Sequence, residues 1–118
     1  MNHAIGRYAE EYACRYLQQR GLSLVQCNYR CPLGEVDLIM RHGDTLVFVE
    51  VRYRRRRDFG SGAESVDARK QARVAAAALH YLQRTGASTR HPARFDVIAM
   101  TPGNGPPNVE WIADAFQR

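Results

Sequence analysis

This chain of 118 residues contains very little lysine: Lys70 is the only one, beside sixteen arginines. A compositional drift towards arginine explains this bias without any function, although it draws attention to the single lysine. Cysteine is also scarce, and the three cysteines, Cys14, Cys27 and Cys31, form no CxxC pair and leave an odd count. A reduced, cytoplasmic setting is therefore the simplest inference. A zinc site is not expected, because none of the four histidines has ligand spacing relative to Cys27 and Cys31.

Long hydrophobic runs are absent as well. The N-terminal segment MNHAIGRYAEEYACRYL carries charges throughout and has no apolar stretch, so it predicts neither a signal peptide nor a membrane span. The chain also lacks internal repeats and any linker-like segment. With 118 residues, of which 45% are hydrophobic, the chain fits one compact domain over residues 1–118.

Positive charge is what the sequence has in excess. The formal net charge is +5, which favours an anionic partner. The bias is concentrated in a basic run, interrupted only by Tyr53, that contains Arg52, Arg54, Arg55, Arg56 and Arg57. Such a run is most simply a solvated loop, but arginines of this kind also supply the phosphate contacts of sequence-independent nucleic-acid binding.

The most informative segment is GEVDLIMRHGDTLVFVEVR, residues 34–52, which reads as a β-hairpin. Gly43-Asp44 is a two-residue turn signal between two runs of β-branched and other apolar residues. This turn pairs Leu38 with Val49 and Met40 with Val47, and places Val36 opposite Val51 on the same apolar face. The other face then carries Asp37 opposite Glu50, and Glu35 opposite Arg52, beside Ile39 and Phe48.

Two carboxylates directly opposite each other destabilise a sheet unless something offsets their repulsion. A divalent cation does so, since magnesium takes oxygen ligands and is commonly held by one or two carboxylates, water and substrate phosphate. The alternative is a solvated face on which Glu35 and Arg52 form a surface ion pair of little energetic value. Ile39 and Phe48 argue against it, because they indicate that this face is covered. We therefore expect Asp37 and Glu50 to form a metal site.

The remaining periodicities predict the order helix, three strands, helix, two strands. One apolar stripe indicates a helix over His3–Arg20 that ends at Gly21; a second helix is expected over Val66–Arg84, with Ser65 as a candidate N-cap. The strands outside the hairpin are expected at Leu22–Tyr29, Arg94–Met100 and Asn108–Ile112, followed by a tail that docks through Phe116. Because a helix connects them, the third and fourth strands should be parallel. The fold class is therefore α/β, a mixed five-stranded sheet flanked by helices.

These residues resemble the PD-(D/E)XK nuclease core, the restriction-endonuclease-like fold, and within it the archaeal Holliday junction resolvases. The resemblance is closer still to the bacterial family UPF0102, also called YraN. Its sequence blocks match residues 34–39, 48–54, 59–60, 70–71 and 94–97, and its closing AF matches Ala115-Phe116. The match covers nearly the whole chain. Since the resolvases are symmetric dimers, the resemblance also makes a homodimer an expectation.

The resemblance implies roles for particular residues. Asp37 and Glu50 correspond to the metal-binding carboxylates, with the backbone carbonyl of Val51 as a further ligand of Mg²⁺ or Mn²⁺. Glu10 corresponds to the helix carboxylate of the resolvases; Glu11 is the alternative, and either is otherwise a solvated helix residue.

Arg52 stands where the nuclease motif has lysine. An arginine is effectively always protonated and cannot act as a base, but it can bind the scissile phosphate and stabilise the charge of the transition state. Lys70, in the KQ block, is the candidate to replace the missing lysine; the alternative for Lys70 is a phosphate contact or an exposed charge.

Three residues outside the site have simpler interpretations. Asp96, inside an apolar strand, is expected to be a buried partner of an arginine such as Arg94, because an unpaired buried carboxylate is costly. Tyr53 either stacks on an unpaired base or is half-buried. Trp111 is expected in the core.

Two functions from different classes follow. The first is a metal-dependent endonuclease acting on DNA, branched or junction DNA included, by water attack on a phosphodiester; Asp37, Glu50, Arg52 and Lys70 are its candidate catalytic residues. The second is a nucleic-acid-binding protein that keeps the fold without efficient chemistry. A third and weaker alternative is a protein–protein module whose arginine run binds an acidic partner.

Overall fold

The computed structural model describes residues 3–55, 66–87 and 92–117. The elements in chain order are α1 (His3–Gln18), β1 (Ser23–Cys31), β2 (Gly34–His42), β3 (Thr45–Tyr53), α2 (Ala68–Thr85), β4 (Ala93–Thr101) and β5 (Asn108–Phe116). They form a five-stranded sheet in the order β1-β2-β3-β4-β5. The sequence-based fold class, α/β with a mixed five-stranded sheet and two helices, is confirmed.

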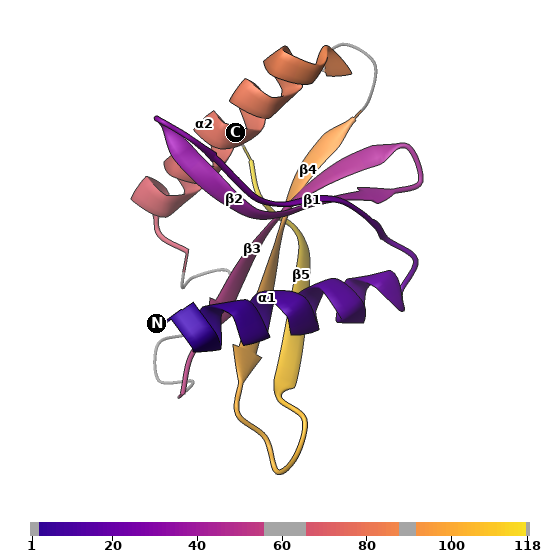
Figure 1. Ribbon diagram of the computed structural model, residues 1–118, viewed down its shortest axis with the longest axis vertical. Coiled ribbons are helices and arrows are strands. Elements are labelled where there is room, and N and C mark those ends of the chain that lie inside the picture. The colour runs from indigo at the N-terminus through magenta and orange to yellow at the C-terminus, as the bar shows by residue number, and fades with distance from the viewer. Residues whose placement is uncertain (1–2, 56–65, 88–91, 118) are drawn as a thin grey trace.

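The sheet is mixed because only one of its neighbouring strand pairs is parallel. β3 and β4 run parallel, as the helix between them requires, and the other three pairs are antiparallel. Figure 1 shows the strong twist of the sheet: β1 and β2 lie across β3, β4 and β5, with α1 and α2 on opposite sides. The described part of the chain contains no helix that is both long and apolar enough to cross a membrane.

The predicted hairpin is present in β2 and β3, with Gly43 at its turn in the left-handed conformation (φ 62°). The predicted pairs Leu38–Val49 and Met40–Val47 are confirmed. The ladder between the two strands ends at Leu38–Val49, and from there towards Gly34 β2 remains paired with β1. β2 and β3 therefore separate at Asp37, the residue before Leu38.

Each face of the sheet is covered by one helix and has its own core. On the α1 face, one cluster joins buried residues of α1, of the segment that follows it, and of β2, β3 and β4: Ala9, Ala13, Leu17, Leu22, Leu38, Met40, Val47, Val49, Val51, Ile98 and Met100. On the α2 face, a second cluster contains Tyr29, Val36, Ile39, Leu46, Phe48, Val66, Val74, Ala77, Ala78, Tyr81, Val97 and Phe116. Ile39 and Phe48 are thus covered by α2, as their apolar character predicts.

Val36 is on the opposite face from the predicted one. It packs in the α2-side core, whereas Leu38, two residues later, packs in the α1-side core. The strict alternation of a strand is broken at Asp37, where β2 leaves β3 and follows β1. Glu35 accordingly pairs with Arg30 of β1, with 3.4 Å between Glu35 Oε2 and Arg30 Nε, so the predicted pairing of Glu35 with Arg52 is wrong.

Several element ends differ from the prediction: α1 ends at Gln18 instead of Arg20, and β1 runs over Ser23–Cys31 instead of Leu22–Tyr29. The N-cap of α2 is Asp67, whose side chain accepts the backbone N–H of Lys70; the predicted cap, Ser65, lies outside the described residues. The last strand continues to Phe116 instead of ending at Ile112. Phe116 stacks on Phe95, with 4.9 Å between ring centroids, so the expected docking of the tail through Phe116 occurs as part of β5.

Asp96 is fully buried and is paired with Arg94, as predicted. Its carboxylate accepts hydrogen bonds from Arg94 Nε at 3.0 Å, Arg94 Nη2 at 3.2 Å, Trp111 Nε1 at 2.9 Å and the Asp114 backbone N–H at 2.9 Å. Trp111 is half-buried against the α1-side core. These donors satisfy both oxygens of Asp96 and join β4 to β5.

Candidate functional site

The two predicted carboxylates meet where β2 separates from β3. Asp37 Oδ2 accepts the backbone N–H of Val51 at 2.8 Å, so the Asp37 side chain bonds β3 beyond the end of the backbone ladder. The Glu50 carboxyl donates a hydrogen bond to the Asp37 carboxylate. The two side chains are neighbours, as the predicted hairpin requires. They are not opposed across a backbone ladder, however; they meet through a side-chain contact at the point where β2 and β3 separate.

Burial makes this pair unusual. Glu50 is only 2% exposed, and loss of solvation, followed by repulsion from Asp37, raises its pKa to about 8. Burial also raises the pKa of Asp37, against the opposing effects of the Val51 N–H and the Glu50 hydrogen bond. The pair therefore retains a proton at neutral pH, held by Glu50, because two adjacent buried carboxylates cannot both ionise without a compensating cation.

Lys70 supplies the nearest positive charge. Its Nζ lies 3.2 Å from Glu50 Oε2, and the first turn of α2 places it there. Asp67 Oδ1 accepts the backbone N–H of Lys70 at 2.8 Å, and Gln71 Nε2 donates to the Val66 carbonyl at 2.8 Å. The adjacent Lys-Gln pair thus has two tasks: Gln71 fixes the start of the helix and Lys70 reaches the buried carboxyl.

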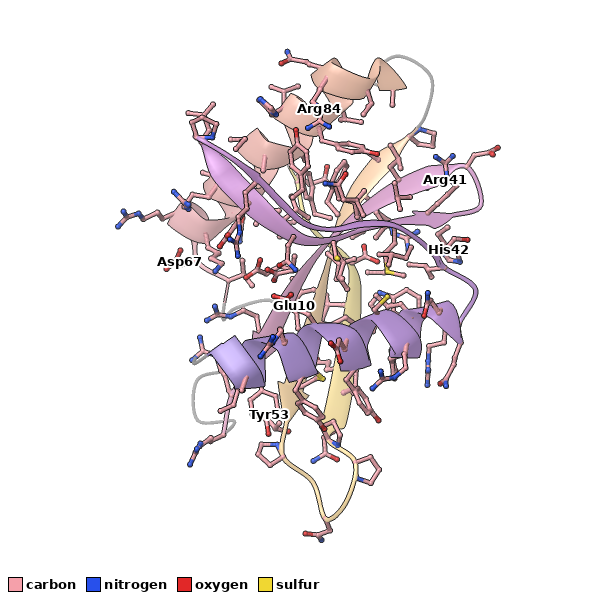
Figure 2. The ribbon with its side chains drawn as sticks, in the orientation of Figure 1. Glu10, Arg41, His42, Tyr53, Asp67 and Arg84 are labelled. Carbon is pink, nitrogen blue, oxygen red and sulfur yellow. The ribbon has the colours of Figure 1, made fainter. Side chains whose placement is uncertain are left out.

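Glu10 approaches the same point from the α1 side. Figure 2 shows its side chain between α1 and the sheet. Burial raises the pKa of Glu10, and the charge of Asp37 raises it further, while a hydrogen bond from the Asn28 side chain lowers it. Glu11 lines the same pocket as Glu10 but is exposed. Of the two candidates, Glu10 is therefore the carboxylate whose pKa is raised by the charge of Asp37.

The donor set suits a hard divalent cation. Asp37 and Glu50 offer only carboxylate oxygens, and the proton between them occupies the place where a cation would relieve their repulsion. Across the described ranges, no group of three or more His, Cys, Asp and Glu side chains is arranged to hold a metal. A cation bound at Asp37 and Glu50 would therefore complete its coordination with water, substrate or the backbone, which is typical of magnesium.

Arg52 follows Glu50 by two residues on β3. Its side chain is half-buried, and its buried Nε has no hydrogen-bond partner in the described part of the chain. A buried, unsatisfied N–H is costly and is common where a ligand completes the contact. Among the described residues, the Arg52 Nε is therefore a donor without an acceptor.

Comparison with known proteins places the chain among relatives of similar length. Residues 9–100 match the model of a family described as "Uncharacterised protein family UPF0102". The chain belongs to this family. UPF0102 proteins of Nitrosococcus oceani (54% identity, 95% of this chain and 90% of the relative) and Pseudomonas savastanoi pv. phaseolicola (51% identity, 94% and 91%) are similar along nearly the whole chain. A UPF0102 protein of Pseudomonas aeruginosa is 46% identical, over 94% of this chain and 90% of its own.

The basic run of this UPF0102 member leaves the sheet beside the site. Tyr53 is half-buried and packs edge-on against Tyr8, with 6.4 Å between ring centroids, so the packing alternative for Tyr53 is the observed one. Arg54 is half-buried and Arg55 exposed. Arg56 and Arg57 lie outside the described residues.

Two residues that bear on the site in this UPF0102 protein escaped the sequence interpretation. Asp67 was detectable, since an aspartate before a helical run is a good N-cap. Asn28 gave no such signal, because its contact with Glu10 joins β1 to α1 and depends on a left-handed backbone (φ 53°).

Proposed function

We propose that this protein is a metal-dependent endonuclease that hydrolyses phosphodiester bonds of DNA, branched or junction DNA included. The observation that supports this most directly is the buried Asp37–Glu50 carboxyl pair with Lys70 Nζ at 3.2 Å from Glu50. A merely structural pair would be stabilised by donors on all its oxygens, as Asp96 is. Asp37 and Glu50 instead keep a proton between them at neutral pH, because the two could not both ionise without a compensating cation.

Asp37 and Glu50 would hold Mg²⁺ or Mn²⁺, with the Val51 carbonyl as a further ligand. Glu10, which forms no three-carboxylate group with them in the described part of the chain, would act on the cation through water. When bound, such a cation lowers the pKa of a coordinated water and neutralises charge on the phosphate. The Val51 N–H orients Asp37 by its hydrogen bond at 2.8 Å. Glu50, whose pKa is raised by burial and by the charge of Asp37, would bind a cation in its ionised form, which the positive charge would favour.

Arg52 and Lys70 would handle the substrate. Arg52 presents a guanidinium that is always charged, with an Nε that has no hydrogen-bond partner among the described residues, and so can bind the scissile phosphate and the additional charge of the transition state. Lys70, whose Nζ lies 3.2 Å from Glu50 Oε2, would be free to turn to the substrate if a cation were bound to Glu50. A lysine can then contact the leaving oxygen and, unlike an arginine, take part in proton transfer.

The partner is expected to be a polyanion. The net charge of +5 and the basic run from Arg52 through Arg54, Arg55, Arg56 and Arg57 favour phosphate contacts without base specificity. A homodimer would present two such surfaces to the two arms of a branched substrate.

The test is a cleavage assay with single-stranded, duplex and four-way-junction DNA in Mg²⁺ or Mn²⁺. We expect the wild type to cut, and Asp37→Asn and Glu50→Gln to lose at least about a hundredfold in rate, because removal of a charge-stabilising group costs about that much. Glu11→Gln, an exposed carboxylate on α1, is the matched control. Cleavage that continues undiminished in both site variants would contradict the assignment.

A second function is favoured by one observation. Arg52 occupies the position of the motif's lysine, and Lys70 is already engaged with Glu50, so a DNA-binding protein without efficient chemistry is the alternative. It predicts salt-dependent DNA binding that survives Asp37→Asn, and no cleavage by the wild type. Restoration of cutting by Arg52→Lys would then identify a degenerate nuclease site.

A further inference from the structure

Three tyrosines of α1 form one stripe along the helix. Tyr8, Tyr12 and Tyr16 are spaced by four residues, so their side chains lie on the same flank. Tyr12 and Tyr16 are half-buried against the α1-side core, and the Arg20 guanidinium covers the Tyr16 ring, with Cζ 3.5 Å from the ring centroid. Tyr8 differs from both, because 45% of it is exposed. The stripe therefore ends, in the N-terminal half of the helix, in a ring that a ligand can reach.

Two neighbouring rings hold Tyr8 in place. Tyr12 lies beside it on the helix, with 6.1 Å between ring centroids and an angle of 43° between ring planes. Tyr53, at the end of β3, meets it edge-on, with 6.4 Å between centroids and an angle of 77°; Figure 2 labels Tyr53 next to α1. Such aromatic pairs are favourable beyond the area that they bury. The Tyr8 ring is therefore oriented before a ligand binds, which lowers the entropic cost of stacking on it.

The charge around Tyr8 favours an anionic partner. Arg7 is exposed directly before Tyr8 in the sequence, and Arg55 is exposed two residues after Tyr53. The whole chain has a formal net charge of +5. Exposed arginines next to an exposed ring supply the two components with which proteins bind single-stranded nucleic acid: cations for the phosphates and an aromatic face for a base.

Tyr53 links the Tyr8 ring to the candidate site. It follows Glu50 by three residues on β3, and a strand rises about 3.3 Å per residue, so the two residues are about 10 Å apart along the strand. A base stacked on Tyr8 would thus belong to a nucleotide near a phosphate held at the Asp37–Glu50 pair. Inside a duplex both faces of a base are covered by its neighbours, so only an unpaired base can stack on Tyr8.

We propose that Tyr8 is a stacking platform for an unpaired base, and that the substrate class of the site is DNA with single-stranded nucleotides beside the cleavage point. The inference rests on the proposed function for the cleavage point, whereas the stacking itself needs neither the cation nor the chemistry. Tyr53 supports the Tyr8 ring and does not itself stack on the base. A duplex without unpaired nucleotides binds through phosphate contacts alone.

The test is the affinity for fluorescein-labelled single-stranded DNA, measured by fluorescence anisotropy in EDTA, where no cleavage occurs. We expect Tyr8→Ala to bind the strand about tenfold more weakly than the wild type, which is within the range for loss of one stacked base. Tyr8→Phe keeps the ring and should stay within about twofold of the wild type, whereas Tyr8→Leu keeps only apolar bulk and should lose as much as Tyr8→Ala. Leu79→Ala, which truncates a 51% exposed side chain on α2, is the matched control and should leave the affinity unchanged.

Two changes to the DNA separate stacking from phosphate contacts. A blunt duplex should bind the wild type and Tyr8→Ala equally. A single strand with abasic sites keeps its phosphates and lacks the base faces, so it should also bind the two proteins equally, as a double-mutant cycle across the interface requires. Equal affinity of the wild type and Tyr8→Ala for the intact strand would overturn the proposal. So would a loss of the same size on the duplex or on the abasic strand.

A second copy of the chain is the other occupant that an exposed ring could take. In that case Tyr8→Ala would lower the molar mass measured by light scattering and leave the affinity for single-stranded DNA unchanged, which overturns the platform.

The outcomes also separate this inference from the nuclease proposal. A wild type that binds the single strand through Tyr8 and cuts no DNA contradicts the nuclease and supports the platform. Cleavage by a protein whose affinity for the single strand is the same in the wild type and Tyr8→Ala does the reverse. A wild type that binds no single strand in EDTA overturns the platform, and the cleavage assay then decides the nuclease by itself.

Discussion

Asp96 and Glu50 are both buried acids, and their surroundings assign them different tasks. Asp96 is 0% and Glu50 2% exposed, so burial alone does not distinguish them. Asp96 receives hydrogen bonds from Arg94, Trp111 and Asp114, which compensate its charge. Glu50 has Lys70 on one side and a second carboxyl on the other, and it keeps a proton instead. The first arrangement stabilises the fold, and the second is suited to binding.

Replacement of Asp96 should therefore be costly to stability. We expect Asp96→Ala to lower the free energy of unfolding by about 3 kcal/mol, because it leaves the partly buried Arg94 guanidinium and two further donors without their acceptor. Urea denaturation followed by fluorescence of Trp111, the only tryptophan, measures the change. Asp96→Asn should cost less, since it keeps one acceptor oxygen; equal stability of Asp96→Ala and the wild type would refute the structural role.

Glu50 should give the metal-free protein a characteristic pH dependence. Its pKa of about 8 in the folded chain exceeds the value of 4.5 for the free side chain, so folding favours the protonated form. This contribution to stability is complete below pH 4.5 and is lost as the pH rises towards 8. In EDTA, we expect the melting temperature of the wild type to fall over this window relative to that of Glu50→Gln, which cannot ionise. Parallel curves for the two proteins would show that the Glu50 carboxyl is not perturbed.

At the scale of elements, the contact between α2 and the start of β2 decides where Lys70 lies. Gly34 lies against the α2 backbone: a Cβ on Gly34 would be 2.0 Å from the Arg73 carbonyl oxygen. The N-cap Asp67 fixes where the first turn of α2 begins. Gly34 therefore sets how closely α2 packs on the sheet, and Asp67 sets where α2 begins.

Gly34→Ala should displace α2. Because the colliding atom belongs to the backbone, the helix must move, and we expect a loss of about 1–3 kcal/mol in the free energy of unfolding. The exposed neighbour Leu33 provides the control, since Leu33→Ala should change stability by less than about 0.5 kcal/mol. Chemical denaturation of both variants measures the difference, and equal stabilities would exclude close packing at Gly34.

Asp67→Ala tests the cap. Loss of the hydrogen bond to the Lys70 N–H should cost about 1 kcal/mol and loosen the turn that carries the Lys70 side chain. Asp67→Asn keeps the capping oxygen and should remain within a few tenths of a kcal/mol of the wild type. Thermal unfolding monitored by circular dichroism measures both, and a large loss in Asp67→Asn would show that charge, not capping, is what matters.

For the whole molecule, the two cores on opposite faces of the sheet make the candidate site possible. α1 brings Glu10 from one face and α2 brings Lys70 from the other, and both influence the pKa of Asp37, or have theirs influenced by it, where β2 and β3 separate. Figure 2 labels Glu10 on α1 and Asp67 at the start of α2, the two helices that cover opposite faces of the sheet. The site therefore depends on the separation of β2 from β3 as well as on the residues of the two strands.

Divalent cations should stabilise the folded chain as a whole. At about pH 8, Mg²⁺ at one hundred times its dissociation constant should add about 2.7 kcal/mol to the free energy of unfolding, a rise of several degrees in melting temperature. The double variant Asp37→Asn/Glu50→Gln should show no such rise, and NaCl of equal ionic strength should not reproduce it. An identical rise in the double variant would place the cation elsewhere.

The hairpin shows how far local pattern reaches. The turn at Gly43-Asp44 and the apolar alternation of Leu38, Met40, Val47 and Val49 were readable because register and face are set by neighbours in sequence. The same reasoning extended the ladder past Asp37 and placed Val36 on the wrong face. Nothing local in β2 signals the separation from β3, which shows only in the end of the ladder at Leu38–Val49.

The sequence by itself determined the element order, the parallel pairing of β3 with β4, the Arg94–Asp96 pair and the candidate carboxylates Asp37 and Glu50. These follow from periodicity, from chain connectivity and from the cost of burying a charge without a partner. Only the tertiary structure decided that Lys70 contacts Glu50 and that, within the described residues, the Arg52 Nε has no hydrogen-bond partner. Such contacts join elements far apart in the chain, and their geometry depends on how two helices pack on a twisted sheet, which no short-range pattern encodes.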